Sequence, residues 1–299
     1  SGNAEITMEV NPATVDYDSL VRYRRAGINR LSIGVQSFQD EELKAIKRRP
    51  RQNTIYQALD DIRQMDFPYF NIDLIYGIKG QTVESFLYSL EEALRFQPNE
   101  LFIYPLYVRQ GTGITEREPD DVCFRMYRAA CKLLQAKGFL QTSMRRFIHH
   151  PSTDAEVSCG DEVMLSCGSG GRSYLGDLHY ATRYTVCQQC IAREIDEYMA
   201  TTDFTVARNG FILSAKEQQQ RFIIKNLMYY MGIDKAEYTR RFGEPLDRTP
   251  LFRQLAEQYW IEETPERIRL TPEGLGYSDY IGQLFITPEI RQLMETYSY

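Results

Sequence analysis

Short apolar segments alternate with amphipathic segments through residues 6–108 of the chain. Apolar runs predict strands at residues 6–10, 31–35, 69–76 and 100–108. The stretches between them predict helices at residues 16–26, 40–48, 53–65 and 82–96, because their apolar side chains recur at helical spacing. Strands that alternate with helices and are almost wholly apolar are typical of a parallel sheet covered by helices. The pattern therefore predicts an α/β fold with a curved or doubly wound sheet.

The chain changes character after residue 210. A helix is predicted at residues 120–137, and residues 144–184 are rich in glycine and predicted to be mostly loop. Ser214 and Glu217 then form the sequence pattern of a capping box at the start of a further helix. Helices at 235–242 and 249–259 and a hairpin at 260–270 complete a mostly helical, winged-helix-like unit. We therefore predict two domains, residues 1–210 and residues 211–299.

Four parallel strands leave a barrel unfinished. Such an arc has exposed edges and an uncovered inner face. Either the C-terminal half of the chain covers them, or βα units upstream are missing. Two such units would add roughly 60–80 residues at ~30 or more per unit.

Composition excludes several classes of function. The 299 residues are 43% hydrophobic and 25% charged, with a net charge of −6, which does not support nucleic-acid binding. No apolar run is long enough for a membrane span, and the first residues do not form a secretory signal. Six cysteines in a chain of this length do not indicate a disulfide framework. We expect a reducing, cytoplasmic setting.

Polar residues interrupt or end the predicted strands. Glu9, Gln36 and Asp73 lie in or at the ends of three successive strands, and parallel strands bring such groups together at their carboxyl edge. A carboxylate can accept hydrogen bonds from a ribose hydroxyl or an ammonium group, and an amide can donate and accept. Arg48 follows one helix after Gln36 and could reach back over the sheet. The alternative is that each residue is satisfied locally.

Two weaker motifs lie further along the chain. Residues 168–174 are rich in glycine, but they match neither a P-loop nor a Rossmann fingerprint, and a tight structural turn is the alternative. Cys187 and Cys190 form one half of a metal-site pattern, with Cys159 and Cys167 as conceivable partners. Real zinc sites usually show two tight pairs, so we interpret these cysteines as adventitious and predict no metal site.

Together these segments resemble the HemN-type radical S-adenosylmethionine (SAM) proteins, a family named for oxygen-independent coproporphyrinogen III oxidase. The resembling segments are residues 4–12, 26–46, 70–86, 101–112, 168–176 and 269–279. The resemblance implies an incomplete TIM-like barrel followed by a characteristic C-terminal domain. The four predicted strands then correspond to the third to sixth of its six strands, so that four of six βα units are present.

The resemblance also implies a cofactor and the residues that bind it. By motif position, the SAM-binding residues are Glu9, Gln36, Arg48, Asp73, Tyr107 and Arg172. Tyr107, on the last barrel strand, and Arg172, in the glycine-rich loop, differ in residue type from the family pattern. The resemblance assigns no catalytic residue.

The chain departs from the family at the iron–sulfur cluster. A Cys-x3-Cys-x2-Cys motif follows the first strand of the family and a glycine-rich motif follows the second, and neither occurs here. Thiolates hold the [4Fe–4S] cluster that reduces SAM. We therefore expect no cluster and no activity in this chain alone, and we favour a truncated form or a proteolytic product of a longer enzyme. The intact enzyme would take a small-molecule substrate such as a tetrapyrrole and electrons from a flavodoxin or ferredoxin.

Several functions remain within the family. The leading hypothesis is the SAM-binding portion of a coproporphyrinogen III oxidase-like enzyme, which abstracts hydrogen with a 5′-deoxyadenosyl radical. The alternatives are a HemN-like methyltransferase or cyclopropanase, and a non-catalytic heme or tetrapyrrole carrier. Residues 158–162 lack the histidine of the heme-chaperone motif, which disfavours that branch. A winged-helix regulator is also disfavoured, because the helix at 250–259 carries Arg253 as its only cation.

Overall fold

The computed structural model describes residues 4–49, 52–109, 111–149, 163–183, 185, 188–246 and 250–296. The chain forms two compact units. The first comprises residues 1–108 and 114–151, and the second comprises residues 109–113 and 152–299. The domain boundary near residue 210 stays a prediction, since the compact units divide earlier in the chain than that.

A six-stranded sheet forms the centre of the first unit, in the order β1-β2-β3-β4-β6-β5. β1 to β4 are parallel, as predicted, whereas β6 pairs antiparallel with both β4 and β5. The antiparallel pair therefore covers one edge of the parallel arc. The strands are β1 (Thr7–Val10), β2 (Arg30–Gln36), β3 (Tyr69–Tyr76), β4 (Glu100–Pro105), β5 (Phe139–Gln141) and β6 (Arg146–His149).

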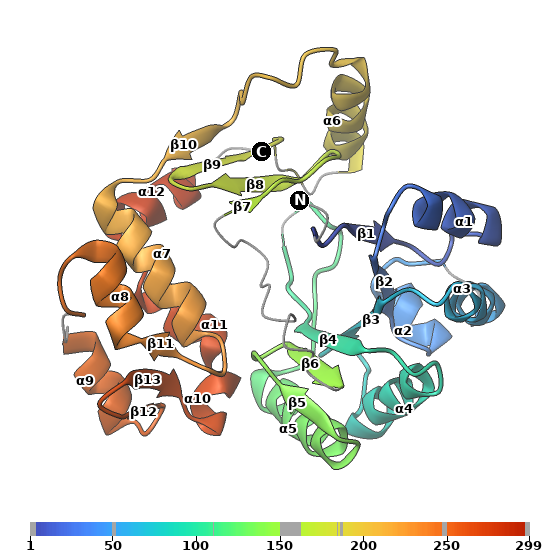
Figure 1. Cartoon of the computed structure of the whole chain (residues 1–299). Helices are drawn as coiled ribbons and strands as arrows, with labels where there is room; N and C mark the ends of the chain where they lie inside the picture. The colour runs from blue at the N-terminus through green and yellow to red at the C-terminus, as the bar shows by residue number, and fades with distance from the viewer. Residues whose placement is uncertain are drawn as a thin grey trace. The chain divides into compact units, whose positions relative to one another are not determined.

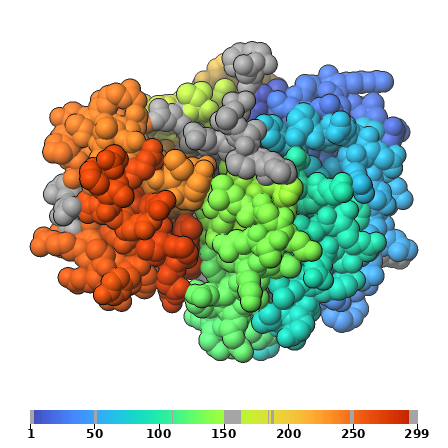
Figure 2. All heavy atoms as spheres, turned by 60° about the horizontal axis from the view of Figure 1, so that its bottom comes forward, coloured from blue at the N-terminus to red at the C-terminus, as the bar shows by residue number. Residues whose placement is uncertain are grey.

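Helices lie on the outer side of the strands in the first unit (Figure 1). Asp16 and Thr82 close capping boxes at the starts of α1 and α4, as their position before amphipathic runs predicts. On the face that Figure 2 presents, the blue-to-green atoms of this unit form a closely packed surface. The helices are α1 (Tyr17–Arg25), α2 (Asp40–Ala45), α3 (Gln52–Gln64), α4 (Val83–Leu94) and α5 (Asp120–Ala136).

The two faces of the parallel sheet differ sharply in polarity. Ile33, Ile72 and Leu101 occupy one register row, are fully buried and belong to the apolar core. Successive strand residues point to opposite faces. The neighbouring row, which includes Asn71 and Glu100, therefore points to the opposite face and is polar. The helices thus cover an apolar face, and the polar groups gather on the other.

The second unit begins with a four-stranded antiparallel sheet in the order β10-β9-β8-β7. Residues 144–184, which were predicted to be rich in loops, also hold the strands β6 to β9, which were not predicted. These strands are two to four residues long, and β7, β8 and β9 are separated by turns that contain glycine, so they show little periodicity. The elements are β7 (Val163–Met164), β8 (Arg172–Leu175), β9 (Leu178–Ala181), α6 (Gln188–Ala200) and β10 (Gly210–Ile212).

The rest of the second unit runs helix, strand, helix, helix and hairpin, as the winged-helix-like prediction requires. Ser214 closes the predicted capping box with Glu217. A separate apolar core, which includes Leu227 and Ile281, lies within this part. No helix in the described residues is long and apolar enough to cross a membrane. The elements are α7 (Ala215–Leu227), β11 (Ile233–Asp234), α8 (Lys235–Phe242), α9 (Pro250–Glu257), β12 (Ile261–Glu263), β13 (Arg267–Leu270), α10 (Pro272–Gly276), α11 (Ser278–Leu284) and α12 (Pro288–Thr296).

Candidate functional site

The end of β2 is irregular, and Gln36 lies at the irregularity. The register with β3 shifts between Gly34 and Gln36, and Gln36 takes a positive φ of 74°. Glutamine rarely adopts this left-handed conformation, which is held only where the surroundings impose it. The Gln36 amide occupies the space beside Gly34, since a Cβ on Gly34 would lie 2.7 Å from Gln36 Nε2. A side chain at position 34 would therefore collide with the Gln36 amide, unless that amide moved.

Arg48 reaches the same place from the end of α2. This helix ends at Ala45, earlier than predicted, because Lys47 adopts a positive φ of 58° and the Arg48 amide donates to the Leu43 carbonyl at 2.9 Å. This is the hydrogen-bond pattern of a helix that turns back at its C-terminus. The Arg48 Nη1 then donates to the Gly34 carbonyl at 3.3 Å. The expectation that Arg48 reaches back over the sheet is confirmed.

Asp73 lies directly across from Gly34 in the register of β2 and β3. Asn71 Nδ2 donates to Asp73 Oδ1 and to Ser32 Oγ, each at 2.7 Å, and Ser32 Oγ donates to Asp73 Oδ2 at 3.3 Å. Asn71 is 2% exposed, and its Oδ1 has no hydrogen-bond partner among the described residues. A buried acceptor without a donor is uncommon and unfavourable in a protein alone, and a ligand that donates hydrogen bonds would satisfy it.

Glu9 contributes a second carboxylate beside Asp73. It is an exposed residue of β1 and the register partner of Ser32. Burial raises the pKa of Asp73 to about 6, and the Glu9 charge adds to that rise. Hydrogen bonds from Asn71 and Ser32 oppose the rise, as does the Arg30 cation. Two carboxylates therefore lie close together, and burial makes the ionised form of Asp73 unfavourable.

Burial also affects Arg48. Desolvation lowers the pKa of its guanidinium, and the Asp73 carboxylate opposes that shift. The structure thus brings Glu9, Gln36, Arg48 and Asp73 together at one edge of the sheet. Glu9, Gln36 and Asp73 were predicted to converge as polar residues of successive strands, and Arg48 joins them from the end of α2, whereas the binding of SAM by these residues stays a prediction.

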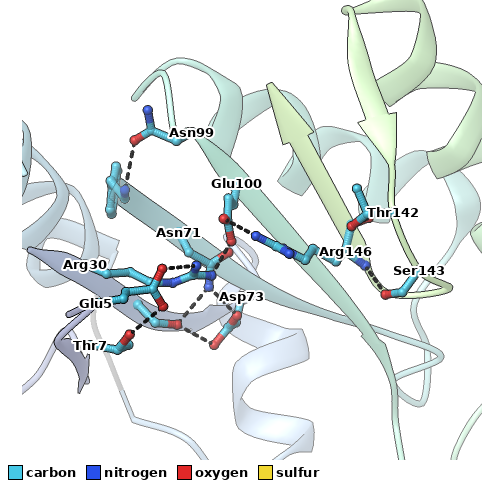
Figure 3. Close-up of polar contacts among 12 residues, drawn as sticks. Glu5, Thr7, Arg30, Asn71, Asp73, Asn99, Glu100, Thr142, Ser143 and Arg146 are labelled. Carbon is cyan, nitrogen blue, oxygen red and sulfur yellow. Dashed lines mark hydrogen bonds and ion pairs between the residues drawn. The ribbon is translucent and has the colours of Figure 1, made fainter. Parts of the chain in front are cut away.

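An ion-pair network on the same face was missed in the sequence. Figure 3 shows Arg30, Asn71, Asp73, Glu100 and Arg146 directed toward one another across the strands. Arg146 Nη2 pairs with Glu100 Oε1 at 2.7 Å, and Arg30 pairs with the other Glu100 oxygen. Glu100 is 2% exposed. The available signal was the alternation of polar residues in β2 (Arg30, Ser32) and β3 (Asn71, Asp73), which indicates a sheet with one polar face.

Tyr107 was predicted to lie on the last strand, and this prediction is wrong, because β4 ends at Pro105. Its hydroxyl accepts a hydrogen bond from Arg145 Nη2 at 2.6 Å, and the Arg145 guanidinium lies 5.8 Å from the centre of the Tyr104 ring. Tyr107 is 43% exposed. Its proposed place beside SAM stays a prediction.

Arg172 belongs to the second unit, at the first position of β8. The glycine-rich segment before it forms a turn whose amides bond within the chain: the Gly168 amide donates to Tyr198 Oη at 2.8 Å, and the Gly170 amide donates to Thr182 Oγ1. These contacts favour the tight-turn alternative for this loop. A role of Arg172 in SAM binding stays a prediction.

The structure offers no support for a metal centre in the cysteine-containing segments. Cys159 and Cys187 lie outside the described residues, while Cys167 and Cys190 are not joined to each other or to another described cysteine by a disulfide. Within the described ranges, no group of three or more histidine, cysteine or acidic side chains is placed to hold a metal ion. The described residues thus include no set of thiolates placed for a [4Fe–4S] cluster, and we derive no reaction step through one.

The chemistry of the edge of the sheet is that of a site for a polar, positively charged ligand. Two carboxylates, an unsatisfied amide oxygen, a second amide and a guanidinium line the same place. The acceptors suit hydroxyl and ammonium donors, and the guanidinium suits a carboxylate. A ligand with an amino-acid group and ribose hydroxyls, such as SAM, fits this set of side chains.

Comparison with known proteins agrees with this fold. Residues 1–93 match the family model of the Radical SAM superfamily, and residues 213–276 match that of the HemN C-terminal domain. The heme chaperone HemW of Escherichia coli is 33% identical over 181 residues, which cover 58% of this chain and 48% of the chaperone. The oxygen-independent coproporphyrinogen III oxidase of Thermostichus vulcanus is 26% identical over 295 residues, which cover 91% of this chain and 90% of the oxidase.

A solved structure shows the same architecture. Coproporphyrinogen III oxidase (HemN) from Escherichia coli superposes with a TM-score of 0.76 at 23% identity, covering 96% of this chain and 70% of that enzyme. This likeness establishes the fold, a partial TIM-like barrel with an appended C-terminal domain. Similarity to the Radical SAM superfamily implies SAM and, in the intact protein, a [4Fe–4S] cluster as cofactors. The chain therefore resembles HemN-like radical SAM proteins in both its N-terminal and its C-terminal part.

Proposed function

We propose that this chain is the SAM-binding portion of a HemN-like radical SAM enzyme that acts on a tetrapyrrole in the manner of coproporphyrinogen III oxidase. The observation that carries the proposal is the convergence of Gln36, Arg48 and Asp73 beside Gly34, with Glu9 on the adjacent strand. The related oxidase, which aligns over most of this chain, supports the choice of substrate class.

Each residue of the site would bind a different polar group of SAM. We assign Asp73 and Glu9 to hydroxyl or ammonium donors of SAM, Arg48 to its carboxylate, and the amides of Gln36 and Asn71 to the remaining polar groups. A reduced iron–sulfur cluster, where one is bound, would supply the electron for the radical chemistry of SAM. The sequence of this chain contains no Cys-x3-Cys-x2-Cys motif to hold such a cluster, so we propose that this chain alone binds SAM without cleaving it.

Equilibrium binding of SAM to this chain tests the proposal. Isothermal titration calorimetry with SAM up to millimolar concentration should show saturable binding of one molecule per chain. Gln36→Ala should weaken the affinity at least about tenfold, since a hydrogen bond to a charged or buried group contributes roughly 1.5–3 kcal/mol. Gln64→Ala, which removes an exposed amide from α3, is the matched control and should leave the affinity unchanged. The absence of saturable binding would refute the proposal.

A second candidate is a non-catalytic carrier of heme or another tetrapyrrole. The similarity to the Escherichia coli protein named heme chaperone HemW favours it, as does the environment of His179. His179 stacks on Tyr174 at a centroid distance of 4.3 Å and meets the edge of the Phe211 ring at 5.3 Å. Its Nε2 is buried and has no hydrogen-bond partner among the described residues, and burial lowers its pKa, which favours the neutral imidazole that binds heme iron.

Hemin titration separates this candidate from the first. A carrier should develop a sharp Soret band with a defined stoichiometry, and His179→Ala should abolish the shift of that band. His149→Ala, which changes a histidine of the first unit, should leave the band in place. Equal spectra for both variants would exclude His179 as an iron ligand and leave the carrier without structural support.

A further inference from the structure

A buried carboxylate that is not part of the candidate site joins the loops that carry the site. Glu42 lies on α2 and is 6% exposed. Its Oε2 accepts hydrogen bonds from Ser37 Oγ at 2.6 Å and from Gln81 Nε2 at 2.9 Å, and its Oε1 accepts one from Ser85 Oγ at 2.6 Å. In the described part of the chain, Glu42 forms hydrogen bonds with neutral side chains and no ion pair.

The first of these contacts fixes the loop after β2. Ser37 directly follows Gln36 in the chain and is fully buried. Its hydroxyl donates to Glu42 and accepts from the Gln39 amide at 2.9 Å. The Phe38 amide donates to the Ser89 hydroxyl at 3.2 Å. Residues 37–39 are therefore each held by a side-chain hydrogen bond, directly after the unfavourable backbone conformation of Gln36.

The second contact fixes the loop after β3, which leads away from Asp73. Gln81 donates to Glu42 through Nε2, and its Oε1 accepts from the backbone amides of Gly77 at 2.7 Å and Ile78 at 3.2 Å. Gln81 is 3% exposed. Since its nitrogen is bound to Glu42, its oxygen is held toward the two amides. The third contact, from Ser85, ties the same carboxylate to the first turn of α4.

The carboxylate is well suited to this role. An ionised carboxylate only accepts hydrogen bonds, so it orients several donors at once, and its hydrogen bonds are shorter and stronger than neutral ones. A buried charge without a cation is unfavourable unless such donors surround it. The arrangement therefore makes the geometry of one loop depend on that of the other.

We propose that Glu42 is a positioning residue that sets Gln36, and the loop after β3, in the geometry that binds SAM. The inference rests on the proposed function, because it concerns the affinity of the same site. Glu42 does not contact the ligand in this proposal. It acts through Ser37 on one strand end and through Gln81 on the other.

Substitution of Glu42 by its isosteric amide tests the proposal. In Glu42→Gln, one oxygen becomes an NH₂ group, so at least one of the three hydrogen bonds must reverse or be lost, and the remaining ones no longer have a charged acceptor. We expect the SAM dissociation constant, measured by calorimetry at a temperature well below unfolding, to rise at least tenfold. The matched control is Glu41→Gln, which makes the same change at the adjacent exposed position and should alter the dissociation constant less than twofold.

A further variant separates positioning from simple loss of stability. Ile62→Val lowers the melting temperature by trimming the buried core at α3 and should leave SAM affinity unchanged. A Glu42→Gln variant that melts earlier but binds SAM normally would overturn the inference and leave the proposed function intact. No SAM binding by the unchanged chain would overturn both.

Discussion

Asp73 shows how a single residue of the site departs from what stability alone would select. Burial raises the pKa of this carboxyl to about 6, although Asn71 and Ser32 both donate hydrogen bonds to it. An aspartate that gained stability by being ionised would show a lowered pKa. Ionised Asp73 is therefore tolerated by the fold, and a ligand that donates hydrogen bonds would compensate for its burial.

The pH dependence of stability follows from this shift. An unfolded aspartate ionises with a pKa of about 3.9, so between roughly pH 4 and 6 the folded chain binds more protons than the unfolded chain. The contribution of Asp73 to stability consequently falls as the pH rises through this window and stays reduced above it. We predict that Asp73→Asn, which cannot ionise, is more stable than the unchanged chain at pH 7.5 by up to about 3 kcal/mol, at roughly 1.4 kcal/mol per pKa unit. Urea unfolding at pH 4 and pH 7.5 measures the difference, which should be small at the lower pH.

The same substitution should weaken SAM binding, because the amide replaces a charged acceptor. Higher stability together with lower affinity would mark Asp73 as a residue kept for binding. Asp60→Asn on the exposed side of α3 is the control and should change neither quantity. If Asp73→Asn lost stability at pH 7.5, the buried carboxylate would have to be a structural anchor instead.

Glu100 has the opposite role on the same face. It accepts ion pairs from two buried arginines, Arg30 and Arg146, which come from strands on either side of it in the sheet. Removal of one partner from a buried ion pair leaves a charge uncompensated, and such changes destabilise proteins by roughly 3–5 kcal/mol. We predict a loss of this size for Glu100→Gln, measured as the shift in the free energy of unfolding in urea.

A surface ion pair provides the comparison for Glu100. Glu262 pairs with Arg269 on the hairpin of the second unit, with both side chains about half exposed. Glu262→Gln should reduce stability by less than about 1 kcal/mol, as is usual for exposed pairs. Equal effects of the two substitutions would mean that the Glu100 network is solvated and does not organise the polar face.

At the scale of elements, the sequence predicts the helices and strands whose formation depends on residues close together in the chain. The helices of the first unit were predicted because their apolar side chains recur at helical spacing, and Thr82 caps α4 at the start of one such run. The strands β8 and β9 were missed because they have four residues each and pair with one another across a glycine turn. The Glu42 hydrogen bonds were equally unreadable, since Ser85 is 43 residues away and its nearness to Glu42 depends on how β2 and β3 pair.

Gly34 belongs to β2 and also lies beside the Gln36 and Arg48 side chains of the candidate site. A methyl group there would lie 2.7 Å from Gln36 Nε2 and 3.9 Å from Arg48 Nη1. The nearest obstacle is the end of a flexible side chain, so the backbone of β2 need not move. We predict that Gly34→Ala displaces the Gln36 amide and weakens SAM affinity about tenfold, equivalent to roughly 1.4 kcal/mol, while the melting temperature stays nearly unchanged. Paired calorimetric measurements of affinity and melting check both parts, and a variant that binds SAM normally would show that the Gln36 amide is not a ligand group.

At the scale of the whole molecule, the pairing of the strands creates the site. Arg30 and Glu100 are 70 residues apart in sequence, and the parallel register of β2, β3 and β4 brings them together. Single-strand patterns identified Gln36 and Asp73 because each interrupts an apolar run. They did not identify Glu100, because a polar residue at the start of a strand is usually solvated. Long-range pairing thus decides which polar residues form the site and which stay at the surface.

The two units have separate apolar cores, one built around the parallel sheet and the other around α7 and the small C-terminal sheet. Each core is a cooperative unit, so we predict two resolvable transitions in differential scanning calorimetry. Leu90 and Leu227 are both fully buried, one in each core, and a Leu→Ala change at such a position removes about 2–5 kcal/mol. Leu90→Ala should lower the transition of the first unit, and Leu227→Ala that of the second. SAM should raise only the transition that Leu90→Ala lowers, because all four side chains that converge at the edge of the sheet belong to the first unit. A single transition that moves equally in both variants would mean that the two cores unfold as one.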